Sequence, residues 1–132
     1  KYLFQSLLEG VLFKEARMTW LHKQLGDTFL VCKRFPVQFD LLAETNLPPC
    51  RSQKLALQIR QDMWRLLQNV RGLLPAVEVT GRETVIYVRA GGQLTCSIHV
   101  RSAQAKLQAM LDDPTSRQRW LNYAALKRCV LL

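Results

Sequence analysis

The 132-residue chain is 48% hydrophobic and carries 19 Lys and Arg against 10 Asp and Glu, a formal net charge of +9. This length fits one domain, and the apolar content is enough to bury a core, which excludes a disordered chain. No apolar run approaches the ~18 residues of a membrane span, so we expect no transmembrane segment.

The first segment, residues 2–24, is predicted to be a helix. Apolar residues recur along it at helical spacing, and Gly26 follows as a natural C-cap. One stripe of this helix contains Leu3, Leu7 and Val11. If the rest of the chain leaves that stripe uncovered, residues 1–26 form a docking element for a partner.

Two short strands, or one strand broken at Pro36, are predicted next, because residues 28–32 and 37–39 are rich in β-forming side chains. Two consecutive prolines then indicate a loop over residues 46–50, since proline fits neither a helix interior nor a sheet ladder.

An amphipathic helix is predicted between Ser52 as N-cap and Gly72 as C-cap, and Pro75 prevents the helix from continuing. The apolar residues between the two caps repeat every three or four positions, which defines one helical face. That face consists of Leu55, Ile59, Met63, Leu66 and Val70.

Three short strands are predicted over residues 77–80, 84–89 and 94–100, because the apolar period changes there to two. The dipeptides Gly81-Arg82 and Gly91-Gly92 are interpreted as the hairpin turns between them. The three strands together form an antiparallel meander.

Two helices close the chain. Ser102 is expected to cap the first helix, and Asp113 caps the second, with Pro114 at its first helical position. The first helix is expected to bury Ala103, Leu107 and Met110 or Leu111.

The order of elements predicts an α+β fold: an N-terminal helix, one or two short strands, an amphipathic helix, a three-stranded antiparallel meander and two C-terminal helices. A ferredoxin-like sandwich, with residues 129–132 as a last strand, and a longin-like arrangement both fit this order. Such topology does not transfer function. We predict a single domain over residues 1–132. The chain starts at Lys1, so we expect an excerpt of a larger protein.

Neither a metal site nor a catalytic motif is predicted. The four cysteines do not have the spacing of a zinc knuckle. We expect them to be reduced thiols, which are typical of an intracellular protein. No nucleophile elbow, phosphate-binding glycine loop or H-E-x-x-H pattern is present. We therefore expect no enzyme and no cofactor. The cysteines are Cys32, Cys50, Cys96 and Cys129.

The basic charge is uneven along the sequence, because residues 1–50 have a net charge of +1 and residues 51–132 have +8. A basic half favours an acidic partner such as nucleic acid, an anionic membrane or an acidic protein. At helical spacing, cations also lie beside aromatic rings, which suits phosphate contacts and base stacking. The candidate residues are Arg60, Trp64, Arg71, Arg119, Tyr123, Lys127 and Arg128.

A simpler interpretation of the same residues is that Trp64 widens the buried stripe while the arginines extend past it into water. With the charge asymmetry included, we expect a non-catalytic interaction module of an intracellular nucleic-acid-associated complex. Its partners are other protein subunits and DNA or RNA, and the nucleus is favoured over the cytoplasm.

Two alternatives remain open. The first is a protein–protein adaptor domain of the membrane-traffic or scaffold type, without nucleic-acid binding, which docks through the first helix or an exposed sheet edge. The second is a prenylated peripheral protein, because Cys129–Leu132 has the pattern of a cysteine, two aliphatic residues and a terminal leucine.

Overall fold

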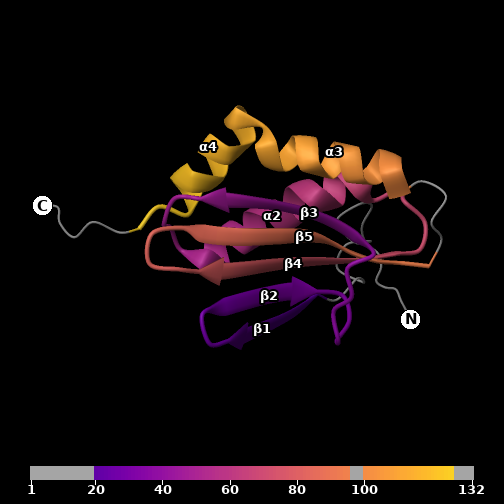
Figure 1. The fold of residues 1–132 in the computed structure, drawn as a ribbon, viewed down its shortest axis with the longest axis horizontal. Coiled ribbons are helices and arrows are strands. Elements are labelled where there is room, and N and C mark those ends of the chain that lie inside the picture. The colour runs from indigo at the N-terminus through magenta and orange to yellow at the C-terminus, as the bar shows by residue number, and fades with distance from the viewer. Residues whose placement is uncertain (1–19, 96–99, 127–132) are drawn as a thin grey trace, which may run out of the picture.

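The computed structural model describes residues 20–95 and 100–126. Within them, one five-stranded antiparallel sheet and three helices confirm the α+β class. The strands are β1 (Leu21–Leu25), β2 (Thr28–Cys32), β3 (Leu41–Leu47), β4 (Leu73–Gly81) and β5 (Ile86–Leu94), and the helices are α2 (Ser52–Leu67), α3 (Val100–Asp112) and α4 (Pro114–Tyr123). The strand order across the sheet is β1-β2-β4-β5-β3 (Figure 1).

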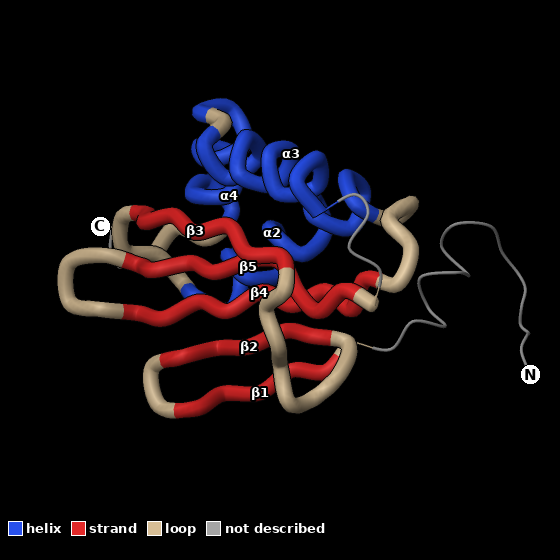
Figure 2. The backbone as a smooth tube through the Cα atoms, turned by 45° about the vertical axis from the view of Figure 1, so that its right-hand side comes forward, coloured by secondary structure: helices blue, strands red, loops and turns tan. Residues whose placement is uncertain are grey.

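The three helices pack on one face of the sheet, which agrees with the predicted layering (Figure 2). α2 lies over β2 and β4, and α3 lies over β3. Every second residue of the strands points toward the helices, as a pleated sheet requires. These inward side chains meet the apolar faces of the helices in one core, whose largest fully buried side chain is Trp120 of α4.

The opposite face of the sheet, here called the outer face, is partly covered by the connection between β2 and β3. Residues 33–40 cross this face in front of β2 and β4 (Figure 2). The Phe39 ring lies 4.8 Å from the guanidinium carbon of Arg89 on β5. Val37 and Phe39 of the connection pack against Leu30, Cys32 and Ala76 of the sheet, which together form a second apolar cluster.

The predicted N-terminal helix is wrong at its end, because residues 21–25 form strand β1. Gly26 is not a helix C-cap. It has a φ of 61° in the two-residue turn that joins β1 to β2, a conformation that glycine adopts without steric cost. The hairpin turn therefore decides the local structure. Residues 1–19, with the stripe of Leu3, Leu7 and Val11, lie outside the described residues.

The strand over residues 28–32 is confirmed as β2, but residues 37–39 form no strand. The sequence analysis also missed β3, whose last residues extend into the predicted loop. Its inward face includes the small Ala43 and the polar Thr45, so the apolar alternation that marks a strand is weak. The loop itself begins at Pro48.

The amphipathic helix is confirmed as α2, although both predicted caps are wrong. Arg51, not Ser52, occupies the N-cap position, and its side chain makes no capping hydrogen bond. The helix ends at Leu67, five residues before Gly72, which adopts a φ of 74° directly before β4. Near this end the buried position is Leu67, while Leu66 remains 38% exposed.

The predicted meander is wrong at its second turn. Gly91 and Gly92 lie inside β5, and β5 ends at Leu94. Val100 already begins α3, and residues 96–99 lie outside the described part of the chain. The turn at Gly81-Arg82, by contrast, is confirmed as the start of the β4–β5 hairpin.

Pro75 lies within β4 because its position removes no ladder bond. Its carbonyl oxygen accepts from the Lys33 N–H at 3.2 Å, just past the end of β2. The N–H and C=O of one strand residue point to the same side, so the N–H that proline lacks would also face Lys33. Lys33 lies one residue beyond the end of β2, so no hydrogen bond between β2 and β4 is lost. Pro75, which was expected only to prevent a helix from continuing, is therefore compatible with strand β4.

Both C-terminal helices are confirmed, with Ala103, Leu107 and Leu111 as the buried residues of α3. Asp113 caps α4, and its Oδ2 accepts from the Ser116 backbone N–H at 2.9 Å. These hydrogen bonds from Ser116 lower the pKa of Asp113 below its ordinary value.

The Asp113 cap predicts a defined pH dependence. Because the folded pKa is lowered, the stabilisation is fully present above ~pH 4 and is lost as the pH falls through the folded pKa. We expect Asp113→Ala to lower the thermal midpoint at neutral pH and to have little effect at about pH 2. Asp113→Asn, which caps without a charge, should show no such pH dependence. A constant deficit of Asp113→Ala across the acid range would contradict this assignment.

Candidate nucleic-acid interface

Charge is divided between the two layers of the fold. Residues 51–71 and 100–126, which contain the three described helices, carry nine Lys and Arg against three Asp and Glu. Residues 20–50 and 72–95, which contain the strands, carry five of each sign. The helical layer therefore has a formal charge of +6, whereas the sheet and its loops are neutral. Asymmetry along the sequence becomes asymmetry between two faces of the molecule.

The three candidate residues predicted on the amphipathic helix, Arg60, Trp64 and Arg71, are brought together only in part. Arg60 lies on the flank of α2 nearest β1, and its guanidinium carbon is 4.8 Å from the centroid of the Trp20 ring. The ammonium of Lys33 is 5.3 Å from the same ring. Trp64, one helical turn after Arg60, is partly buried. Arg71 does not join them, because α2 ends at Leu67 and Arg71 is exposed in the following turn.

Arg119, a candidate residue of the last helix, lies on the other flank of α2, where α4 packs. Arg119 donates to Oδ2 of Asp62 at 2.7 Å, and the indole N–H of Trp120 donates to the same oxygen at 2.7 Å. Arg65 donates to Oδ1 of Asp62 at 3.3 Å. Asp62 therefore holds two arginines side by side. Neither Asp62 nor Arg65 is predicted from the sequence, since their pairing with Arg119 depends on how α4 packs against α2.

Arg65 and Arg119 keep donors available to solvent. Their side chains are 70% and 51% exposed, and each uses one nitrogen to bind Asp62. A guanidinium has five N–H groups, so most of its donors face outward. Both arginines line a depression of about 340 Å³ between α2, α3 and α4, and Leu66, Met110 and Ser116 also line it. Such a depression suits a phosphate next to an apolar sugar or base.

The remaining candidate residues differ in position. Tyr123 is half exposed at the end of α4, with the ammonium of Lys54 5.4 Å from its ring centroid. The neighbouring Arg117, which was not among the candidate residues, binds the fold itself, because it donates to the Asn46 carbonyl at 2.7 Å. Lys127 and Arg128 lie outside the described residues.

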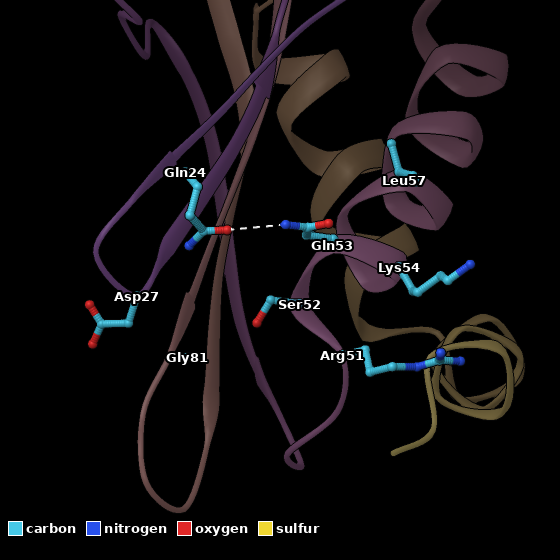
Figure 3. Close-up of a pocket in the computed structure, with 8 residues that line it drawn as sticks. All are labelled: Gln24, Asp27, Arg51, Ser52, Gln53, Lys54, Leu57 and Gly81. Carbon is cyan, nitrogen blue, oxygen red and sulfur yellow. Dashed lines mark hydrogen bonds between the residues drawn. The ribbon is translucent and has the colours of Figure 1, made fainter. Parts of the chain in front are cut away.

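A larger pocket, of about 530 Å³, opens at the N-terminus of α2 (Figure 3). Gln53 donates to Gln24 at 3.3 Å across it. The two cations that line this pocket, Arg51 and Lys54, point away from Gln24 in Figure 3. Arg51 donates to the Tyr123 carbonyl at the end of α4, at 3.3 Å. The cationic surface is therefore on the α2–α4 side rather than in this pocket.

The described cysteines, Cys32 and Cys50, are buried free thiols. Burial raises the pKa of both Cys32 and Cys50, which keeps these thiols protonated at neutral pH. In the part of the chain that the structure describes, no group of three or more His, Cys, Asp or Glu is placed to share a metal ion. None of the helices described there has the length and apolarity to cross a membrane.

Comparison with protein-family models, curated protein sequences and solved structures finds no match for this chain.

Proposed function

We propose that this domain is a non-catalytic interaction module of an intracellular, and by preference nuclear, nucleic-acid-associated complex. The observation that supports this function is the separation of charge, with a net charge of +6 on the helical layer and a net charge of zero on the sheet and its loops. Charge gathered on one face attracts a polyanion to that face, whereas charge needed only for solubility is spread over the whole surface.

Phosphate contacts in this proposal come from Arg65 and Arg119, with Arg60 on the opposite flank of α2. The two arginines of the depression are held at a fixed spacing by Asp62, so less side-chain entropy is lost when they bind phosphates. Binding through phosphates is independent of sequence and weakens with salt. DNA and RNA are both ligands of such a surface.

The test is fluorescence anisotropy with labelled single- and double-stranded DNA and RNA over a salt series. The double variant Arg65→Ala, Arg119→Ala is expected to weaken duplex binding by roughly tenfold to a hundredfold and to reduce the slope of log affinity against log salt by about 2. Asp62 keeps its bond to Trp120 in this variant, so we expect the fold to persist.

A matched control removes the same charge from the sheet side. Arg34 and Arg82 are exposed residues of the β2–β3 and β4–β5 connections, and the double variant Arg34→Ala, Arg82→Ala should bind nearly as well as the original chain. Equal losses in both double variants would show that only net charge matters, which contradicts a helical interface. A flat signal at low salt would contradict nucleic-acid binding altogether.

A protein–protein role has separate support, because β1 is an exposed edge strand. The prenylation alternative concerns Cys129–Leu132, outside the described residues, and stays a prediction.

A further inference from the structure

The two edges of the sheet are treated very differently by the rest of the fold. β3 forms one edge, and side chains of α3 and α4 bind its outward backbone groups. These bonds join Leu42 N to Gln104 at 3.4 Å, Glu44 N and O to Gln108 at 3.3 and 3.0 Å, and Asn46 O to Arg117 at 2.7 Å. This edge is closed to another strand.

β1 forms the other edge, far from α3 and α4 (Figure 1), and all five of its residues are exposed. Lys33 N donates to the Pro75 carbonyl, so the backbone groups of Phe29 and Val31, at alternate positions before Lys33, also face β4. The backbone groups of residues 28, 30 and 32 therefore face β1, and their partners, residues 21, 23 and 25, face β2. The backbone groups of His22 and Gln24 therefore point away from the sheet. Within residues 20–95 and 100–126, no hydrogen bond reaches them.

Apolar side chains surround this free edge on the outer face. Lys23 pairs with Leu30 of the outer-face cluster, so residues 21, 23 and 25 share that face. Leu25 is 52% exposed, and Leu21 and Phe35 are 37% and 38% exposed. The ammonium of Lys23 stands among them, 5.3 Å from the centroid of the Phe35 ring. We call Leu21, Lys23, Leu25 and Phe35 the outer strip.

We propose that β1 is the docking edge for an extended segment of a protein partner. The segment adds to the sheet as a further strand through the backbone groups of His22 and Gln24. On the outer face it places an acidic side chain opposite Lys23 and apolar side chains opposite Leu21 and Leu25. The recognised sequence therefore alternates as apolar, any, acidic, any, apolar.

Charge argues against a second copy of this chain as the occupant. An antiparallel pair of β1 strands that joins His22 to Gln24 of the other copy places Lys23 directly opposite Lys23. Like charges at directly opposed positions destabilise a strand pair, whereas an acid in that place stabilises it. In this register the outer strip therefore favours a partner that places an acid opposite Lys23 over a second copy.

The test is selection of a random dodecapeptide library on the intact chain, with a His22→Pro chain selected in parallel. Proline removes the outward N–H but no bond to β2, so this variant is expected to fold. We expect peptides that are enriched only on the original chain and that show the acidic alternation. A synthetic peptide of that consensus should bind a Lys23→Glu chain about tenfold more weakly, and its acid-to-lysine counterpart should recover the loss.

Three results would overturn the proposal: no enrichment over the His22→Pro chain, a consensus without the alternation, or peptides that bind the Lys23→Glu chain equally well. A dimer of the original chain that is lost in His22→Pro would identify a second copy as the occupant instead. Nucleic-acid binding by the helical layer is independent of this edge, so His22→Pro should leave the salt-dependent binding unchanged, and each idea can fail alone.

Discussion

Gly92→Ala is expected to leave the chain largely unfolded at 25 °C. Gly92 has a φ of 142° inside β5, and a Cβ there would overlap the backbone carbonyl of Leu74 on the neighbouring strand. Backbone atoms cannot move aside by a rotamer change, so the β4–β5 pairing must open. The φ strain alone costs about 1–3 kcal/mol, and the overlap adds to it. The total reaches the exceptional range above ~4 kcal/mol for one substitution.

Gly26→Ala is the matched control for this experiment. Gly26 also has a positive φ, of 61°, but a Cβ there meets no atom within 4 Å. Only the left-handed conformation is penalised, by about 1–2 kcal/mol. Circular dichroism and urea unfolding of both variants separate the two effects. Equal urea midpoints for Gly26→Ala and Gly92→Ala would contradict the close approach of β4 and β5 at Gly92.

Trp120→Ala is expected to lower the free energy of unfolding by about 3–5 kcal/mol, the usual range for removing a buried aromatic side chain. Trp120 of α4 is fully buried in the core, and its indole N–H donates to Asp62 of α2. Urea unfolding monitored by circular dichroism measures the loss. Tyr123→Ala, on the same helix but half exposed, should cost far less. Similar losses would mean that α4 does not pack as described.

Trp120→Phe separates the packing of the indole from its hydrogen bond. Phenylalanine refills most of the space but leaves Oδ2 of Asp62 without one of its two donors at 2.7 Å. We expect a loss of about 1–3 kcal/mol, smaller than for alanine. The same variant should also alter nucleic-acid affinity if Asp62 sets the spacing of Arg65 and Arg119. Unchanged affinity with reduced stability would limit Asp62 to a structural role.

Local signals predicted the helices well. Leu55, Ile59 and Met63 identify α2, and Asp113 with Pro114 marks the start of α4, because each pattern depends only on neighbours within a few positions. β3 escaped prediction because its identity as a strand depends on pairing with β5 along its whole length. Gly91 and Gly92 were misinterpreted as a turn for the same reason.

The candidate site shows the same limit. Arg60, Arg119 and Tyr123 could be chosen from helical spacing, whereas Arg71 was chosen because the spacing was extended past the true end of α2. Arg65 and Asp62 could not be found, since nothing in the sequence says which flank of α2 meets α4. The contact that organises the site joins residues that are 57 positions apart.

The glutamines on α3 have a consequence for growth of the sheet. A strand that adds at β1 finds an open row of donors and acceptors, but the row at β3 is already occupied by Gln104, Gln108 and Arg117. In the terms of polymer chemistry the domain is a chain terminator and not a monomer. One strand can add to the sheet at β1, and the β3 edge offers no site for a second strand. Runaway strand-by-strand polymerisation is therefore blocked by three side chains on the helices, at the edge opposite to the one that docks.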